Sequence, residues 1–319
     1  MYFGLPDDAL ALRDGLRELL TAACPPATVR AAWDGSPCEP LWKELGAFGL
    51  LGLLAPEERG GLGLDELSFA AAMEEAGYAG VPGPLVETVV SAPLLDLPLD
   101  GSARIALRRS LGPVAYAGTS THLLDVASGP GLLDLATCEV DPVETVDRSR
   151  RMGDVRGLGA PVALPGDQRR LLELRGTLGT AAFLHGLARR QVDLTVAYLR
   201  TRKQFGVPIG SFQALKHPLA DAVVGTEFAW PVVLHAAHAL SQGEPDADVR
   251  VSHAKAAASE AAYQVSRVCL QAHGAMGYTV EYDLHLFAKR TWALAKDWGT
   301  ASQHRDRVAA ALRIERTAP

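Results

Sequence analysis

The chain has 319 residues, 48% of them hydrophobic, and a formal net charge of −6 at pH 7. This length and composition predict a globular protein with a large core and more than one packed unit. Acidic residues stand near the start of the chain, where a secretory signal peptide needs basic ones. No apolar run approaches the roughly 18 residues of a membrane span. The four scattered cysteines lack the CxxC spacing of zinc sites. We therefore expect a soluble, cytoplasmic protein with reduced cysteines, no metal, and neither a membrane nor a nucleic-acid partner.

Apolar spacing changes along the chain and divides it into three predicted domains. Residues 1–98 carry helical periodicity, interrupted by the loop-like sequence APEERGGLGL. Residues 99–167 carry short β-favouring runs separated by Gly, Pro and Asp, namely RIAL, PVAYAG, HLLDVA and GLLDLATCEV. Long amphipathic patterns return in residues 168–319 and predict a four-helix bundle with helices near 169–203, 210–241, 247–273 and 281–316. The predicted fold class is mostly α with a small middle β domain.

Charge is distributed unevenly between the two halves of the chain. Residues 1–167 hold 12 Lys and Arg against 24 Asp and Glu, whereas residues 168–319 hold 19 against 13. The basic C-terminal half is the better candidate for binding an anionic ligand, although an ordinary solvated surface explains the same count.

The sequence RTRKQFGVPIGSFQALKH, residues 200–217, predicts a corner between two helices. Gly206 suits a left-handed helix end, the proline after it prevents continuation, and Ser211 is a good N-cap for the next helix. This corner exposes Arg202 and Gln213, and a guanidinium there suits a pair of phosphate oxygens. The same Arg also complements the dipole of a helix end, and the residues alone leave both interpretations open.

Two further stretches interrupt strong helical patterns with glycine. In QAHGAMGYTVEYDLH, residues 271–285, Gly274 and Gly277 suit either an anion-binding turn or a plain turn between helices. In LAKDWGTASQHR, residues 294–305, a Gly-Thr step inside an apolar pattern indicates that the backbone passes close to a neighbour. Neither stretch identifies a ligand by itself.

The stretches at residues 200–217 and 271–285, in this order and together with APEERGGLGL, resemble the acyl-CoA dehydrogenase family over most of the chain. The resemblance implies an N-terminal helical domain, a middle β domain and a C-terminal four-helix bundle. It also implies FAD shared at a subunit interface, with the flavin in one subunit and the ADP half held by the C-terminal helices of its neighbour. The residues that match the family's cofactor-binding positions are Arg202, Phe205, Gln213, Gln271, Gly274, Ala275, Gly299 and Thr300. At Ala275 the family has a second glycine.

The resemblance identifies two usual positions for the catalytic base, and neither holds a carboxylate here. Family enzymes remove the proton α to the thioester carbonyl with a glutamate that directly precedes the Gly-Thr step or lies on the first bundle helix. These positions hold Trp298 and Gly176. Asp297 and Glu173 are the nearest substitutes, but the first is rotated by about 100° around a helix and the second is displaced by about 4.5 Å along its axis. Because proton transfer needs contact of about 3 Å, we expect both to be solvated acids.

The middle domain is shorter than the resemblance requires. A complete domain of two packed sheets needs about 100 residues, whereas residues 99–167 provide 69. The sequence VETVDRSRRMGDVRG resembles the second half of the family's domain, and the first half, whose loop covers the flavin, is missing. We therefore expect a subunit that holds an ADP moiety without burying a flavin and an acyl thioester of its own.

Three functions remain open. The favoured one is a non-catalytic or half-site subunit of an α2β2 acyl-CoA dehydrogenase, resembling those of actinobacterial steroid side-chain degradation. A catalytic paralogue then supplies the flavin pocket, the base and most of the acyl-CoA cleft, and an electron-transfer flavoprotein accepts the electrons. The second is a self-sufficient homo-oligomeric enzyme that uses Asp297 or Glu173. The third is a non-enzymic interaction subunit with a relic FAD site.

Two histidines are the sequence's best metal candidates. His235 and His238 lie three residues apart on one helical face, a spacing that suits a shared metal ion. No acidic or cysteine partner is evident nearby in the sequence. We expect ordinary histidines here.

Overall fold

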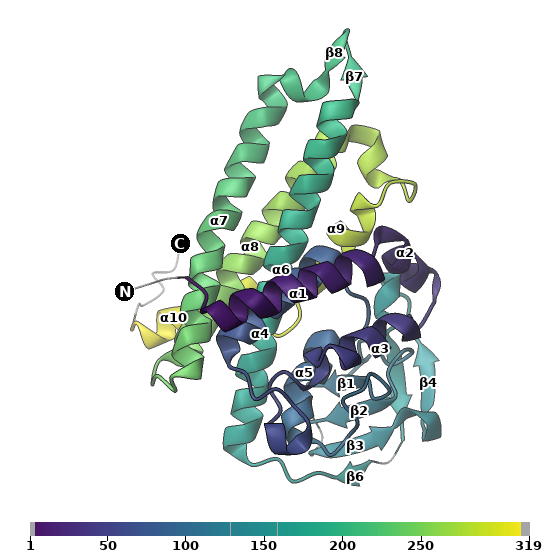
Figure 1. The fold of residues 1–319 in the computed structure, drawn as a ribbon, viewed down its shortest axis with the longest axis vertical. Helices are drawn as coiled ribbons and strands as arrows, with labels where there is room; N and C mark the ends of the chain where they lie inside the picture. The colour runs from purple at the N-terminus through teal and green to yellow at the C-terminus, as the bar shows by residue number, and fades with distance from the viewer. Residues whose placement is uncertain (1–3, 128, 158, 314–319) are drawn as a thin grey trace. The chain divides into compact units, whose positions relative to one another are not determined.

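The computed structural model describes residues 4–127, 129–157 and 159–313, and the chain forms two compact units (Figure 1). The first, here called the bundle unit, comprises the described parts of Met1–Arg13, Glu66–Gly80 and Thr177–Pro319. The second, here called the sheet unit, comprises the described parts of Asp14–Asp65 and Val81–Gly176. Two of the boundaries fall within helices, α1 (Asp7–Ala23) and α6 (Gly166–Thr201).

The sheet unit combines short helices with two small sheets. Its four-stranded sheet has the order β1-β2-β3-β6, in which β1 runs parallel to β2 and the other neighbours are antiparallel. A separate hairpin pairs β4 with β5. The strands are β1 (Ile105–Arg108), β2 (His122–Asp125), β3 (Gly131–Asp134), β4 (Glu139–Pro142), β5 (Gly153–Arg156) and β6 (Ala160–Pro161). The helices are α2 (Pro26–Asp34), α3 (Glu39–Ala47) and α5 (Leu85–Ser91), with 3-10 turns η1 (Leu50–Gly52), η2 (Glu57–Arg59), η3 (Ala92–Leu94), η4 (Leu135–Thr137) and η5 (Arg148–Arg150).

One predicted β run does not form a strand. Residues 113–118, the run PVAYAG, turn at Tyr116, whose φ is 64°. Val114 forms an isolated bridge to Gly153 instead of a ladder. The apolar residues of this turn still join the core of the sheets, which contains Ala106, Val114, Ala117, Leu123, Leu133, Leu135 and Val155.

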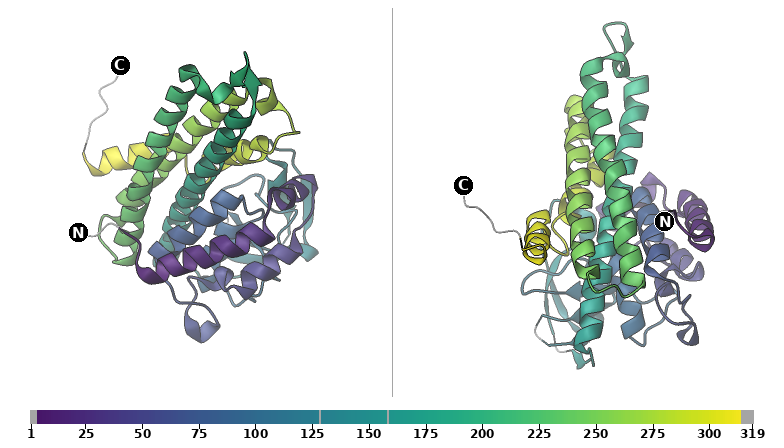
Figure 2. Two further views of the ribbon diagram at one scale, coloured as in Figure 1. Left: turned by 45° about the horizontal axis from the view of Figure 1, so that its top comes forward. Right: turned by 90° about the vertical axis from the view of Figure 1, so that its left-hand side faces the viewer.

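The bundle unit is built on three long helices. Helices α6, α7 (Gln213–Ser241) and α8 (Ala247–His273) lie alongside one another in two independent views (Figures 1 and 2). A short hairpin of β7 and β8 lies at one end. The remaining elements are α4 (Glu66–Ala79), β7 (Lys203–Gln204), β8 (Val207–Pro208), η6 (Ile209–Ser211), η7 (Gly274–Tyr278), α9 (Leu284–Leu294) and α10 (Ala301–Ala311).

Small side chains explain the close packing of α8. Its buried positions recur every three or four residues, which places them on one face of the helix. Alanine at these positions lets neighbouring helix axes approach. The buried residues that follow this pattern are Val251, Ala254, Ala258, Ala262, Val265 and Cys269.

The structure confirms a mostly helical chain with a small β segment and corrects three predicted boundaries. The first bundle helix ends at Thr201, and the left-handed Gly206 lies in the turn of the β7–β8 hairpin, not at the helix end. The N-cap of α7 is Phe212, whereas the Ser211 hydroxyl donates to the Pro208 carbonyl. The predicted helix at 281–316 is divided into α9 and α10. In the described part of the chain, no helix is both long and apolar enough to cross a membrane.

Helices α4 and α6 touch through glycine. A Cβ on Gly186 would lie 1.9 Å from the carbonyl oxygen of Glu74, and one on Gly77 would lie 2.1 Å from the carbonyl oxygen of Phe183. Beside these backbones, His185 Nδ1 donates to the buried Glu74 carboxylate at 3.0 Å. Glycine is therefore needed at both positions for the helices to approach this closely.

We expect Gly186→Ala to lower the free energy of unfolding by about 3 kcal/mol, because the new methyl group forces two packed helices apart. Gly225→Ala on α7 is the matched control, since a Cβ there meets nothing within 4 Å. The control should stabilise the protein by about 0.5 to 1 kcal/mol. Urea denaturation followed by circular dichroism measures both. Equal effects of the two substitutions would contradict the close α4–α6 contact.

Candidate cofactor-binding site

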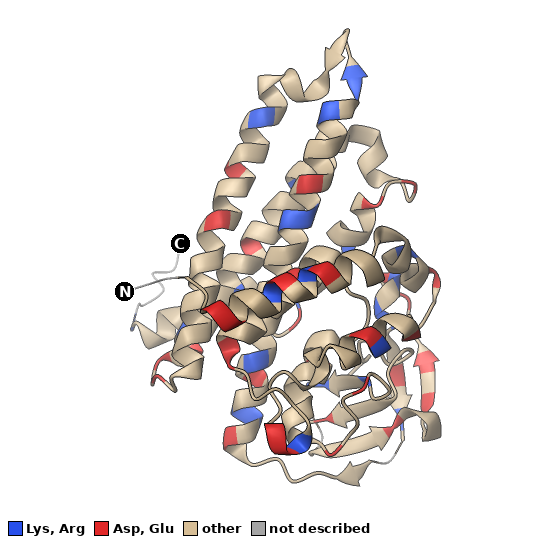
Figure 3. Cartoon of the chain, in the orientation of Figure 1, with Lys and Arg blue, Asp and Glu red and all other residues tan. Residues whose placement is uncertain are grey.

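The predicted cofactor residues of the first motif lie at one end of the bundle unit. Arg202 directly follows α6, and its carbonyl oxygen accepts a hydrogen bond from Ile209 N at 2.8 Å, which closes the hairpin. Phe205 and Gly206 form the turn with φ values of 53° and 82°, and Phe205 is 92% exposed. Gln213 is the exposed first residue of α7. Figure 3 shows basic residues at this end of the bundle. The structure thus brings Arg202, Phe205 and Gln213 to one exposed corner.

The second motif forms the end of α8 and the turn after it. Gln271 is exposed in the last turn of the helix. Gly274 follows with a φ of 58° and a ψ of −136°, and a Cβ there would meet nothing within 4 Å. Ala275 is also exposed, in η7. The backbone at Gly274 is therefore open to a ligand, and its positive φ explains the glycine.

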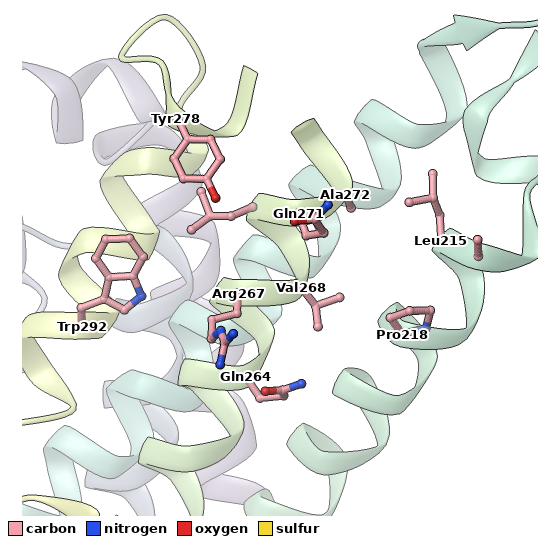
Figure 4. Close-up of a pocket in the computed structure, with 11 residues that line it drawn as sticks. Leu215, Pro218, Gln264, Arg267, Val268, Gln271, Ala272, Tyr278 and Trp292 are labelled. Atoms are coloured by element: carbon pink, nitrogen blue, oxygen red, sulfur yellow. The ribbon is translucent and has the colours of Figure 1, made fainter. Parts of the chain in front are cut away.

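A pocket of about 500 Å³ lies on the surface of α7, α8 and α9 and includes one of these residues (Figure 4). Its volume falls within the range that suits a small ligand or part of a nucleotide. Gln271 is the predicted cofactor residue among its walls, and Arg267 contributes a positive charge. The lining residues are Ala214, Leu215, Pro218, Gln264, Arg267, Val268, Leu270, Gln271, Ala272, Tyr278 and Trp292.

An aromatic stack around His273, which the sequence patterns did not predict, packs at the end of α8 beside the second motif. The buried His273 ring stacks on Tyr198 at 4.3 Å and lies 4.9 Å from the ring of Tyr282. Its Nδ1 donates to the Cys269 carbonyl at 2.8 Å. Burial lowers the pKa of His273, which favours the neutral imidazole near pH 7. His273 therefore fixes the turn and does not bring a charge to it.

The Gly-Thr step forms a tightly held turn between α9 and α10. Trp298 is buried, with 3% of its surface exposed and a φ of 56°, and its carbonyl accepts from His304 Nε2 at 2.8 Å. Gly299 has a φ of 102°, and a Cβ there would lie 2.7 Å from the same nitrogen. Thr300 caps α10: its N–H donates to Gln303 Oε1 at 2.9 Å, and its hydroxyl accepts from Gln303 N at 3.3 Å. The N–H of Thr300 is thus already engaged within the protein.

A buried lysine, which sequence reasoning missed, holds this turn to α8. Lys255 is 0% exposed, and its Nζ donates to Ser259 Oγ at 2.9 Å. The same Nζ reaches the carbonyls of Leu294 and Ala295 at 3.3 Å and that of Gly299 at 3.2 Å. The available signal was a charged residue on the apolar face of an Ala-rich helix. Such a residue is buried only when polar groups surround it.

Of the four positions considered for a catalytic base, Trp298 and Gly176 carry no carboxylate, and Glu173 and Asp297 do. Gly176 is buried within α6. Glu173 is held by Arg109, whose Nε lies 3.1 Å from both carboxylate oxygens and whose Nη2 lies 2.5 Å from one of them. A carboxylate in such a forked pair is committed to the guanidinium. Asp297 is partly buried and directly precedes Trp298.

The two candidate metal-binding histidines have other surroundings. Arg250 Nη1 donates to His235 Nε2 at 2.9 Å, so this ring nitrogen is already engaged within the protein. His238 is exposed on the same helix. Among the residues that the structure describes, no group of three or more His, Cys, Asp and Glu is arranged to hold a metal ion.

Comparisons with known proteins match both helical parts of the chain. The family model for the acyl-CoA dehydrogenase N-terminal domain matches residues 6–98, and that for the C-terminal domain matches residues 170–313. Acyl-CoA dehydrogenase IpdE2 of Mycobacterium tuberculosis is 32% identical over 309 residues, which cover 91% of this chain and 93% of that protein. The resemblance predicted from the motifs is confirmed.

Two solved structures share the fold over nearly the whole chain. The Tcur3481-Tcur3483 steroid ACAD G363A variant has a TM-score of 0.84 and 25% identity, covering 97% of this chain and 99% of that one. The ChsE4-ChsE5 complex from Mycobacterium tuberculosis has a TM-score of 0.84 and 24% identity, and the match covers 100% of this chain and 100% of the matched chain. The fold class predicted from the sequence is therefore confirmed.

We expect Lys255→Met to lower the free energy of unfolding by about 2 to 4 kcal/mol, because it leaves buried carbonyl groups without their donor. Lys296→Met is the matched control: Lys296 is exposed two residues before Trp298 and should change stability by less than about 0.5 kcal/mol. Urea denaturation of both variants provides the measurement. If Lys255→Met were as stable as its control, the turn would not depend on this amine.

Proposed function

The chain belongs to the acyl-CoA dehydrogenase family, and we propose that it is a half-site subunit of a heteromeric FAD-dependent acyl-CoA dehydrogenase. In this proposal the chain contributes the ADP-binding side of a cofactor whose flavin lies in a catalytic paralogue. One contrast carries the proposal. The corner that contains Arg202 and Phe205 is exposed and ready for a ligand, whereas the base positions hold Trp298 and Gly176.

The exposed corner suits the ADP half of FAD, the cofactor that relatives in the family bind. The Arg202 guanidinium can donate two parallel hydrogen bonds to pyrophosphate oxygens. The backbone at Gly274 is open to a close approach, and Gln271 lines the adjacent pocket. Phe205, with 92% of its surface in water, is the kind of apolar side chain that a partner or cofactor covers. When bound, the flavin of FAD accepts a hydride from the β carbon of an acyl thioester.

The residues at the Gly-Thr turn do not suit a subunit that binds the flavin and supplies its own catalytic base. The side chain before Gly299 is a buried indole, which cannot accept a proton from the α carbon of a thioester. The N–H of Thr300 already serves the cap of α10. Glu173 is paired with Arg109, which disfavours a self-sufficient enzyme. The carboxylate base and most of the acyl-CoA cleft therefore belong to the partner in our proposal.

The relatives indicate the kind of partner and substrate. One solved structure is named as a steroid ACAD with two components, Tcur3481 and Tcur3483, and another as a complex of ChsE4 with ChsE5. We extend this to the chain as an α2β2 assembly with an acyl-CoA dehydrogenase paralogue, acting in the cytoplasm on a steroid side-chain acyl-CoA. Electrons then leave for an electron-transfer flavoprotein. The proposal keeps the three domains expected from the sequence, residues 1–98, 99–167 and 168–319.

The folded chain alone should not reduce FAD with any saturated acyl-CoA, and Trp298→Glu alone should not restore activity. Anaerobic loss of the visible flavin absorbance after substrate addition measures this. In the complex with its paralogue, Glu173→Gln and Asp297→Asn should keep the turnover rate within about threefold, because neither side chain is the base. A loss of about 100-fold in either variant would assign the base to this chain and sink the half-site proposal.

We expect Arg202→Ala to weaken FAD binding by the complex by about 10- to 150-fold, because a charge-assisted contact to phosphate contributes about 1.5 to 3 kcal/mol. Arg202→Lys should recover part of this loss, since an ammonium cannot form the two-pronged contact.

Arg200→Ala is the matched control for Arg202, because Arg200 is exposed in the last turn of α6, two residues before Arg202, and complements the same helix dipole. Its effect on FAD affinity should stay below about threefold. Titration of FAD into each apo-complex gives the affinities. Equal effects of the two alanine variants would reduce Arg202 to a helix-end charge.

A further inference from the structure

The two cofactor motifs stand at the ends of different helices. Arg202 directly follows α6 and Gly274 directly follows α8, and these helices lie alongside one another (Figures 1 and 2). Two motifs can hold one pyrophosphate only if their hydrogen-bonding groups keep their positions to within about 0.5 Å. Contacts within the protein must therefore fix one helix end relative to the other.

Three aromatic rings, here called the aromatic cluster, join these two helix ends. His273, the last residue of α8, stacks on Tyr198 of α6 with ring centroids 4.3 Å apart and an angle of 19° between the ring planes. Tyr282, from the segment before α9, lies 4.9 Å from the His273 ring and 5.6 Å from the Tyr198 ring. Its hydroxyl donates to the Leu194 carbonyl of α6 at 3.2 Å. The cluster thus ties the end of α8 to the last turns of α6.

Two rings of the cluster adjoin cofactor residues. Arg202 N donates to the Tyr198 carbonyl at 2.9 Å, so the Tyr198 ring and the arginine backbone belong to one turn. His273 immediately precedes Gly274. The turn η7 folds back on His273, because a Cβ on Gly277 would lie 3.2 Å from the His273 Cβ. A displacement of the His273 ring therefore changes the position of one motif relative to the other.

His273 takes its place in the cluster as a neutral ring. Its Nδ1 donates to the Cys269 carbonyl at 2.8 Å, one turn earlier on α8. Its Nε2 is buried, and no group in the described part of the chain forms a hydrogen bond with it. Burial lowers the pKa of His273, because a second proton would leave a charged N–H without an acceptor. An aromatic ring without the Nε2 nitrogen can therefore stack in the same way.

We propose that the aromatic cluster positions the Arg202 guanidinium and the Gly274 turn for the same pyrophosphate, and that His273 acts on FAD only through them. This inference rests on the half-site function, which supplies the ligand. His273 is a positioning residue in this account, since it is 3% exposed and packed between two rings.

A double-mutant cycle between His273 and Arg202, carried out in the complex with the paralogue, tests this inference. His273→Ala should weaken FAD binding by about 5- to 50-fold, because the arginine loses the position from which it contacts the phosphates. His273→Ala combined with Arg202→Ala should bind FAD within about threefold of Arg202→Ala alone, since a misplaced arginine contributes little. Titration of FAD into each apo-complex gives the affinities, and urea denaturation shows whether each variant is folded.

Three further substitutions separate positioning from general stability. His273→Phe keeps a flat ring in the stack and should hold the FAD affinity within about threefold of the wild-type value. Gly186→Ala is the destabilising control, because it forces α4 and α6 apart about 18 Å along α6 from Tyr198. Its effect on FAD affinity should stay below about twofold and should multiply with that of Arg202→Ala. Tyr198→Leu removes the partner ring and should repeat the loss of His273→Ala, which serves as the test if that variant does not fold.

Independent, multiplying effects of His273→Ala and Arg202→Ala would overturn the positioning role, and so would an equal loss for His273→Phe and His273→Ala. These outcomes leave the half-site function standing, because Arg202 still binds FAD in them. An Arg202→Ala variant with unchanged FAD affinity would instead contradict the half-site function, and the positioning role with it. The affinity of the Arg202→Ala variant therefore distinguishes the two failures.

Discussion

The amine of Lys255 fixes the backbone of the turn that contains Trp298 and Gly299. It joins the carbonyls at the end of α9 and that of Gly299 to α8, inside a core where unpaired carbonyls would be costly. His304 also donates to the carbonyl of Trp298, so the turn has little conformational freedom. Trp298 and Gly299 both adopt positive φ there. The side chain that precedes Gly299 is thereby committed to a buried position. In our proposal, the buried Trp298 occupies the position that the family resemblance gives to the catalytic glutamate of most members.

The exposed corner of the bundle unit has the opposite character. Its side chains are exposed, and one of them, Phe205, is almost wholly in water although its ring lies 6.2 Å from that of Phe212. The free energy falls when a ligand or another subunit covers groups of this kind. In our proposal, a catalytic paralogue covers this corner, and a chain without its own base thereby remains necessary to an active assembly.

Sequence patterns predicted most of the fold because its helices are long and amphipathic. The motifs around Arg202 and Gln271, together with the N-terminal sequence APEERGGLGL, were sufficient to identify the family, since glycines and an arginine at fixed spacings reflect local backbone needs. The hairpin at Phe205 was missed because its two strands are only two residues long. The division between α9 and α10 was missed because one apolar pattern runs through both helices.

Contacts between distant residues were beyond the reach of periodicity. The pair of Arg109 and Glu173 spans 64 residues, and the contact of Lys255 with Gly299 spans 44.

Counting FAD in the purified complex, by absorbance of released flavin against protein mass, tests most directly whether the flavin and ADP sites lie in different subunits. We expect one FAD for each pair of this chain and its paralogue, because in our proposal each pair has one flavin-binding site and one ADP-binding site. Two FAD per pair would show that this chain holds a flavin of its own and would contradict the half-site role.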